Sequence, residues 1–333
     1  MRVKEINIRP EDTEKKYNDL LTSEIKDYFL DNNGCIKDGM SVDVNCLACD
    51  KNDSKLFMEK DGFNLQHCNH CGLVYLNPRP SERALIDFFS NSKAIDLYSE
   101  MVESTKSERY DLIFNPLADF IINKYGNNGG SLLEVGCGSG LFLETMANKA
   151  PSWDLKGVEP NQSAVDICNK KDIKVFHGSL EDLNDPDGYD LIVFWAVFDH
   201  FFDPFSIVVK THKLLKKGGS ILIGNLNIDG FESVILGKDN TAITPPERQN
   251  FFGVESMTQM LARAGYKDVE VKTTGKLDVD IVKNYWSTDG SNGRSEFLEK
   301  VIFGSEELKN TFQTFLMDNN LSGHMTVTAV KGD

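Results

Sequence analysis

Short apolar runs alternate with amphipathic stretches from residue 131 onward, and this pattern sets the expected architecture. The run 191–198 is apolar without alternation, as a strand buried on both faces of a parallel sheet should be. Strands that alternate with helices at this pace predict an α/β fold with helices on both faces of the sheet. We predict strands at 131–136, 154–158, 173–176, 189–196 and 219–225, and helices at 139–149, 161–170 and 204–216.

The flanking regions have mostly helical spacing instead. The two prolines within 77–80 predict a linker, because neither can donate to a strand ladder. A long loop at 244–251 contains two adjacent prolines followed by polar side chains, which favours a lid over the site. We expect helices near 13–29, through 81–125, at 254–264 and over most of 276–320, with further strands at 267–271 and 325–330.

These patterns divide the chain into five regions, which we name by their expected structure. They are an N-terminal helical leader at 1–44, a cysteine-bearing module at 45–80, a helical connector or lid at 81–130, an α/β core at 131–275, and a helical insertion with a closing strand at 276–333.

Composition narrows the class of protein. The chain has 333 residues and a formal net charge of −15, which disfavours binding to nucleic acid through phosphates. The N-terminus has no apolar core, and a membrane span needs roughly 20 apolar residues, far more than the run 191–198 supplies. We therefore expect a cytoplasmic protein with neither a membrane nor a nucleic-acid partner.

Four of the seven cysteines form two Cys-x-x-Cys pairs, Cys46 with Cys49 and Cys68 with Cys71. The spacing is typical of a four-thiolate zinc site, which has no open coordination position and is therefore structural. Three alternatives remain. A histidine beside the second pair, His67 or His70, could replace one thiolate, another metal could be bound, or the zinc could be catalytic. Acidic and basic residues balance between positions 46 and 80, which argues against a nucleic-acid-binding zinc ribbon.

The segment EVGCGSG at 134–140 predicts a cofactor pocket. Its alternate glycines allow a sharp turn from strand to helix and a close approach of backbone to a ligand. Glu159, at the end of the next strand, is placed to accept the hydroxyls of an adenosine ribose. A dinucleotide-binding unit has the same acid. However, the glycine spacing, the acid Glu134 before the loop and the extra strand after Gly265 favour a different nucleotide cofactor.

The segment 134–140 and five later segments resemble the successive motifs of class I S-adenosylmethionine-dependent methyltransferases. The later segments are 157–160, 178–183, 190–204, 214–224 and 251–266. The resemblance implies a Rossmann-like sheet and S-adenosyl-L-methionine as cofactor. It places Glu159 at the ribose and Ser179 with Leu180 at the adenine. That family often has Asp where Ser179 stands, and Ser179 or Glu181 is the candidate to replace it in contacting the adenine amino group. The implied cofactor-binding residues are Glu134, Gly136, Cys137, Gly138, Gly140, Glu159, Pro160, Ser179, Leu180 and Trp195.

The segment 67–80 resembles the zinc-binding N-terminal module of bacterial sugar C-methyltransferases and related enzymes of polysaccharide pathways. In that group the module helps to cover the substrate. The resemblance implies that Tyr75 or Arg79 contacts the substrate; a buried tyrosine and a linker arginine are the alternative.

The acceptor should lie beyond the carboxyl ends of the parallel strands. His200 follows such a strand and is the candidate general base, with Asp199 to orient it; a packing or capping role is the alternative. Asn225, after the fifth strand, and Arg248, in the expected lid, are candidate substrate ligands. The planar donors of Arg248 suit a phosphate.

The sequence thus predicts an S-adenosylmethionine-dependent methyltransferase that acts on a small metabolite, with a nucleotide-linked sugar as the favoured substrate. A methyltransferase of RNA or protein that docks through the cysteine module, a scaffold that keeps the cofactor pocket without turnover, and a dehydrogenase remain alternatives. The methylated atom, the oligomeric state and the role of 276–320 are left open.

Overall fold

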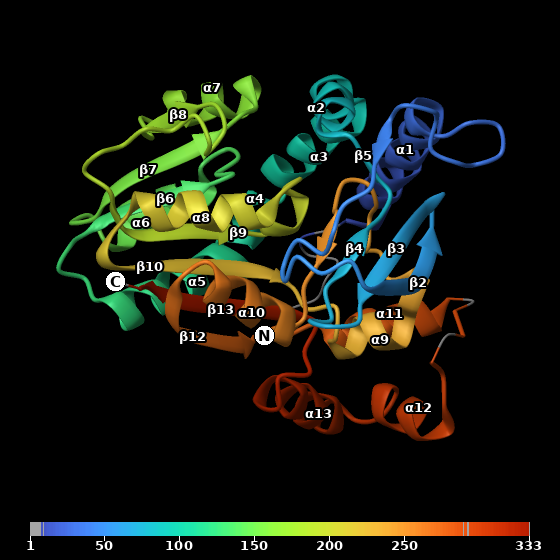
Figure 1. Cartoon of the computed structure of the whole chain (residues 1–333). Helices are drawn as coiled ribbons and strands as arrows, with labels where there is room; N and C mark the ends of the chain where they lie inside the picture. Colours follow the sequence, from blue (N-terminus) through green and yellow to red (C-terminus); the bar gives the residue numbers. More distant parts are fainter. Residues whose placement is uncertain (1–7, 9, 289, 292, 333) are drawn as a thin grey trace.

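The fold is built around a seven-stranded sheet, seen here in a computed structural model that describes residues 8, 10–288, 290–291 and 293–332 (Figure 1). The strand order is β12-β13-β10-β9-β6-β7-β8, and only β13 runs antiparallel to its neighbours. This confirms the predicted Rossmann-like α/β class. The strands are β6 Ser131–Val135, β7 Asp154–Glu159, β8 Val175–His177, β9 Tyr189–Trp195, β10 Leu215–Leu226, β12 Tyr266–Thr273 and β13 His324–Lys331.

Helices cover both faces of this sheet. In β9, Leu191 and Val193 pack into one apolar cluster, whereas Ile192 and Phe194 pack into another on the opposite face. This explains why the strand lacks alternation. The first cluster contains residues of α5 Asn115–Tyr125, α6 Leu141–Lys149 and α7 Gln162–Lys170; the second contains residues of α8 Pro204–Leu214 and α10 Val254–Arg263.

A smaller antiparallel sheet lies beside the central one, in the order β11-β4-β3-β2 (Figure 1). Its edge strand β11 comes from the expected lid loop, so this part of the loop is a fixed strand paired with β4. The N-terminal elements are α1 Glu11–Phe29, β1 Ser41–Val42, β2 Ser54–Lys60, β3 Phe63–Cys68, β4 Val74–Leu76, β5 Arg79–Pro80, α2 Glu82–Asn91, α3 Lys93–Ser104, α4 Lys106–Arg109 and the π-turn Tyr110–Phe114, and β11 is Asn250–Phe251.

Two local predictions were wrong. The segment 77–80 is no linker, because Arg79 and Pro80 form β5, pair with β1 and are buried. The helix expected to reach residue 216 ends at Leu214, and β10 begins at Leu215, with a register irregularity before Ser220. In both places tertiary pairing overrides the local proline and glycine signals.

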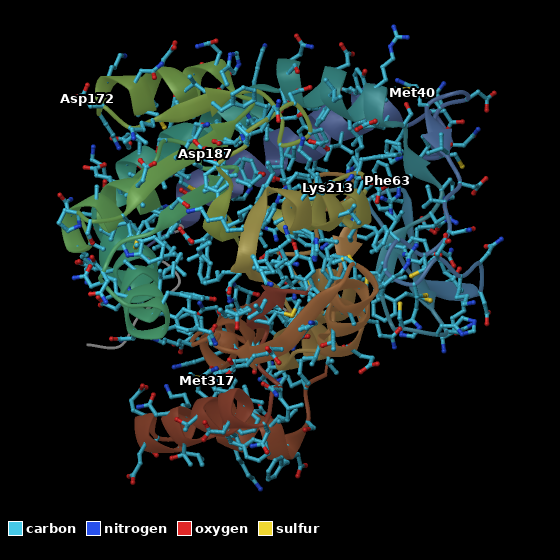
Figure 2. All side chains as sticks on the ribbon, turned by 60° about the vertical axis from the view of Figure 1, so that its left-hand side comes forward. Met40, Phe63, Asp172, Asp187, Lys213 and Met317 are labelled. Carbon is cyan, nitrogen blue, oxygen red and sulfur yellow. The ribbon has the colours of Figure 1, made fainter. Side chains whose placement is uncertain are left out.

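The C-terminal insertion is helical, as expected. Its helices are α11 Asp278–Ser287, α12 Glu296–Ile302 and α13 Glu306–Asp318, and α9 Phe231–Leu236, which follows β10, packs in the same apolar cluster. The last two helices, α12 and α13, lie at the bottom of Figure 1, outside the central sheet, and Met317 marks α13 at the lower side of Figure 2. Among the described residues, no helix is long and apolar enough to cross a membrane.

Candidate functional site

The glycine loop after β6 is held against β7 by its backbone. The N–H groups of Gly136 and Cys137 donate to the carbonyl of Val158, at 2.8 and 3.2 Å. Gly136 has φ +70°, and a Cβ there would lie 2.7 Å from Val197 Cγ2. Gly138 has φ +53°, and no atom lies within 4 Å of the position a Cβ would take. The loop is therefore closely packed against Val197 at Gly136 and open at Gly138, as expected for backbone that a ligand approaches.

Two carboxylates flank this loop. Glu134 is buried, and its Oε2 has no hydrogen-bond partner. Burial, with the nearby Cys168 and Glu159, holds the pKa of Glu134 well above its ordinary value. Glu159 accepts hydrogen bonds from the N–H groups of Gly138 and Asn161, both at 2.9 Å, yet burial still raises its pKa. Such a pair fits a ligand that brings an ammonium group to Glu134 and hydroxyl donors to Glu159.

The other expected cofactor residues lie at or just after the ends of β6, β7, β8 and β9. The Ser179 hydroxyl donates to Asp182 at 2.7 Å, so this exposed acid, which the sequence analysis did not single out, stands beside the position where the family often has Asp. Leu180 is buried in the core. The Cys137 sulfur lies 3.8 Å from the Gly138 carbonyl, and the Pro160 carbonyl lies 3.1 Å from His177 Nε2.

The strand β9 ends in a turn that carries the acceptor-side candidates. Ala196 adopts φ +55°, a conformation that non-glycine residues rarely take, and Asp199 and His200 follow in a single 3₁₀ turn. Asp199 is fully buried. One of its oxygens accepts a hydrogen bond from Arg248 Nη1, and the other lies 3.4 Å from His200 Nε2.

The Arg248 side chain is 19% exposed. Burial lowers its pKa, but the carboxylates of Asp199 and Glu247 more than offset this, so the pKa lies above its ordinary value. The Tyr17 hydroxyl of α1 donates to Glu247 at 3.2 Å, which places the N-terminal helix over this side of the site. The predicted pair Asp199–His200 and the predicted Arg248 are thus brought together, although their mutual contact was not foreseen.

The structure adds His324, the first residue of β13. Its ring centroid lies 5.3 Å from that of Trp195. Burial lowers the pKa of His324 to about 4, although the Asp278 carboxylate opposes this shift; the charge of Arg248 adds to it less strongly. No sequence signal marks this residue, because its position depends on strand pairing with β10.

Asn225 is 1% exposed near the end of β10, and neither its amide oxygen nor its amide nitrogen has a partner. Tyr75 and Arg79 are fully buried. Tyr75 packs in the same apolar cluster as Cys46, Cys68 and Cys71, and its hydroxyl has no partner. This enclosure favours the structural alternative for both Tyr75 and Arg79.

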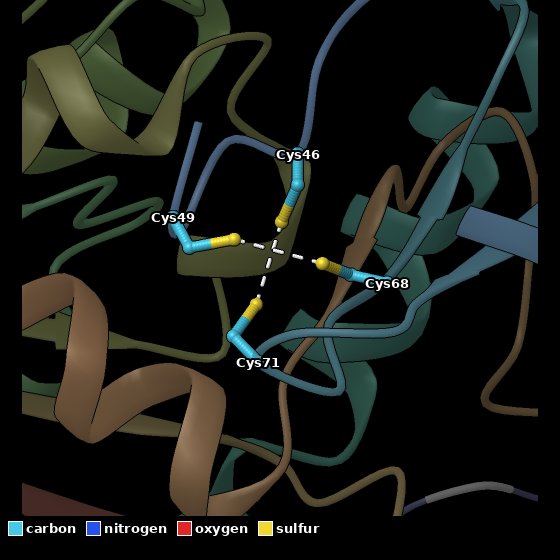
Figure 3. Close-up of side chains that lie close together, drawn as sticks. All are labelled: Cys46, Cys49, Cys68 and Cys71. Carbon is cyan, nitrogen blue, oxygen red and sulfur yellow. Dashed lines mark hydrogen bonds between the residues drawn. The ribbon is translucent and has the colours of Figure 1, made fainter. Parts of the chain in front are cut away.

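The four cysteines of the two pairs converge, and their sulfurs point toward one another (Figure 3). All four Sγ atoms lie within 4.8 Å of one another, with 3.4 Å between Cys46 and Cys71 and 3.6 Å between Cys49 and Cys68. Tetrahedral zinc with Zn–S bonds of about 2.3 Å requires sulfurs roughly 3.8 Å apart. The donor set therefore fits a four-thiolate structural site.

Backbone geometry supports this fit. After each Cys-x-x-Cys pair the chain adopts a positive φ, at Asp50 (+63°) and Gly72 (+77°), and the N–H there donates to the carbonyl of the first cysteine of the pair. Of the two neighbouring histidines, His67 stacks on Phe57, whereas His70 lies 3.3 Å from Asp53. Neither belongs to the cluster of described metal-ligating groups.

Comparisons with known proteins agree with this geometry. A family model described as "Methyltransferase domain" matches residues 106–271. A malonyl-[acyl-carrier protein] O-methyltransferase of Priestia megaterium is 25% identical over 187 residues, which are 53% of this chain and 65% of that protein. A mitochondrial ubiquinone biosynthesis O-methyltransferase of Candida albicans is 20% identical over 67% of this chain and 61% of its own length. The chain thus spans just under two thirds of these two relatives.

Among solved structures, the plantazolicin methyltransferase BpumL in complex with SAH has a TM-score of 0.48 and 20% identity, over 74% of this chain and 92% of its own. A possible histamine N-methyltransferase of Thermotoga maritima has a TM-score of 0.46 and 17% identity, over 70% and 97%. The family match and the curated relatives show that residues 106–271 form a class I S-adenosylmethionine-dependent methyltransferase domain, which is an enzyme domain.

Proposed function

We propose that the protein transfers the methyl group of S-adenosylmethionine to a small polar metabolite in the cytoplasm. The observation that carries this proposal is the contact between the two halves of the site. Gly136, in the cofactor loop, packs against Val197, and Asp199 and His200 follow in the next turn. A methyl donor held on the loop and an acceptor held by the turn would therefore be neighbours, as a direct displacement requires.

Different residues of the chain would bind different parts of the cofactor. Glu134 would take the ammonium group, which compensates a buried carboxylate that has an unpartnered oxygen. Glu159 would take the ribose hydroxyls, Ser179 or its neighbour Asp182 the adenine, and Trp195 would border the methyl-bearing end. S-adenosylmethionine supplies a methyl group on a sulfonium, which needs no further activation as a leaving group.

On the acceptor side, we propose His200 as general base. Its Nε2 faces the Asp199 carboxylate at 3.4 Å, so the tautomer with the proton on Nε2 leaves Nδ1 free to accept the acceptor's proton. Asp199 would fix the ring orientation and stabilise the imidazolium. Arg248 and Asn225 would hold polar groups of the acceptor.

The relatives named as O-methyltransferases favour oxygen as the methylated atom. A nucleotide-linked sugar remains the favoured substrate, because of the likeness of 67–80 to sugar methyltransferase modules and because Arg248 suits a phosphate. The four cysteines would hold a structural zinc. The net charge of −15 argues against RNA as the acceptor.

The test is an incubation of purified protein with methyl-labelled S-adenosylmethionine and a whole-cell extract, followed by separation of the products by size. We expect label in the small-molecule fraction, and loss of that label in Glu159→Ala. Label in RNA or protein would show that the methyl acceptor is a macromolecule and would refute the proposed small-molecule acceptor. Binding of the cofactor without any labelled product would favour a scaffold.

A further inference from the structure

The turn that carries Asp199 and His200 is held by an unusual run of hydrogen bonds. The backbone carbonyls of four consecutive residues each accept one bond. Gln249 N donates to Asp199 O at 2.9 Å, Gln249 Nε2 to His200 O at 3.1 Å, Asn250 Nδ2 to Phe201 O at 2.7 Å, and Arg79 Nη1 to Phe202 O at 2.7 Å.

These donors belong to the cysteine-bearing module, to the strand β11 that is added to its sheet, or to Gln249 directly before that strand. Asn250 pairs with Tyr75 in the β11–β4 ladder, and the N–H of Leu76 donates to the carbonyl of Gln249 at 3.0 Å. Arg79 follows in β5. The strand β4 begins three residues after Cys71, so the folding of the cysteine cluster fixes the sheet from which the donors project.

Arg79 connects the parts of this arrangement. It is fully buried, and besides Phe202 O it donates to Asn250 Oδ1 at 3.2 Å and to Leu76 O at 3.3 Å. Its guanidinium also lies over the Phe202 ring, 5.6 Å from the centroid. The guanidinium holds five N–H donors in a rigid planar fork, so it serves these three separated acceptors in a fixed geometry that the single nitrogen of a lysine ammonium does not reproduce.

We infer that Arg79 is a positioning residue, through which the cysteine-bearing module sets the conformation of the 199–202 turn. The inference rests on the proposed function only for the role of that turn in binding the acceptor. The coupling between the module and the turn is a property of the fold. The cofactor loop is held by β7 instead, so metal or Arg79 should control the acceptor side and leave cofactor binding almost unchanged.

The chain offers a matched control in Arg263. This residue also joins the core to the module, since it donates to Ala48 O at 3.3 Å and lies over the Phe205 ring, 3.7 Å from the centroid. It makes no bond to the carbonyls of 199–202. A general loosening of the module against the core would follow either substitution, whereas a specific effect on the turn would follow only that of Arg79.

The experiment measures amide hydrogen exchange of peptides covering 199–203 in the full-length protein, together with the affinity for S-adenosylhomocysteine. We expect Arg79→Met to speed exchange there by about tenfold or more, the effect of a lost charge-assisted hydrogen bond. Arg79→Lys should be intermediate, because the charge and one donor nitrogen remain in place of the three nitrogens that Arg79 uses, and Arg263→Lys should match the wild type. Affinity for S-adenosylhomocysteine should stay within about threefold, because none of these bonds touches the cofactor loop.

Equal exchange in the wild type and in Arg79→Met would overturn the inference, as would a parallel loss of S-adenosylhomocysteine affinity or an equal effect of Arg263→Lys. If Arg79→Met does not fold, Asn250→Ala is measured in its place, because it removes both the donor to Phe201 O and one acceptor of the Arg79 guanidinium, and the same outcomes apply. Failure to find a methyl acceptor would refute the proposed function but not this coupling, because no arm of the experiment uses transfer.

Discussion

The proposed cofactor side and the proposed acceptor side of the site are built in different ways. Glu134, Gly136, Gly138 and Glu159 come from two adjacent parallel strands and the loop between them. The acceptor side joins the turn after β9 to Arg248, to β5 and to the first residue of β13. A binding surface for a common cofactor can thus be local, while the surface for a particular substrate is assembled from distant segments.

The two sides also differ in charge. On the cofactor side, two neighbouring carboxylates have raised pKa values, and burial is the main cause for each. On the acceptor side, the buried carboxylate of Asp199 is already paired with Arg248. We therefore expect the cofactor side to gain most from a positively charged ligand, and the acceptor side to behave as a rigid, internally neutralised group.

The largest effect should come from the cysteine cluster. Cys68→Ser removes one of four thiolates, and a structural zinc is worth on the order of 10 kcal/mol to an isolated metal-folded module. We expect loss of bound zinc and a fall in Tm of more than about 10 °C, because this module shares an apolar cluster with the core. Metal analysis and calorimetry check this, with exposed Cys35→Ser as control. One zinc retained per chain would refute the four-thiolate site.

A smaller effect should follow from breaking the buried ion pair on the acceptor side. Asp199→Asn leaves the Arg248 guanidinium without its carboxylate, which should lower the free energy of unfolding by about 3 kcal/mol. Denaturant unfolding measures this. Asp119→Asn, which removes an exposed pair with Lys149, should cost less than about 1 kcal/mol. Equal losses would mean that Arg248 is solvated rather than held by Asp199.

The smallest effect concerns pH. Because the folded-state pKa of Glu134 is raised, its contribution to stability is complete below the ordinary carboxyl range and is lost as pH rises toward neutrality. Cofactor-free Glu134→Gln should therefore lose less stability than the wild type between pH 5 and pH 8. Calorimetry at both pH values tests this difference. An identical loss in both proteins would show that Glu134 is not strained in the cofactor-free state.

Much of the fold was predictable from the sequence, because strand and helix periodicities in the α/β region are local. The glycine loop and the positions of the cysteine pairs were predictable for the same reason. Arg79 and Pro80 were not, because a proline-rich stretch has the local pattern of a linker, and only its pairing with β1 makes it a buried strand.

The acceptor side was predictable only in fragments. Asp199, His200 and Arg248 were each singled out, but nothing in the sequence joins Asp199 to Arg248. His324 was missed, because its place beside Trp195 follows from the antiparallel register of β13 on β10. The bonds from Arg79 and Asn250 to the 199–202 turn likewise exist only once the module has docked.

The most direct test is a calorimetric titration of the purified protein with S-adenosylmethionine, in the wild type, Glu159→Ala and Asp199→Asn. We predict one site per chain, an affinity roughly 10- to 100-fold weaker in Glu159→Ala through lost charge-assisted hydrogen bonds, and nearly wild-type affinity in Asp199→Asn. No binding to the wild type, or an equal loss in both variants, would contradict a local cofactor side that is separable from the acceptor side.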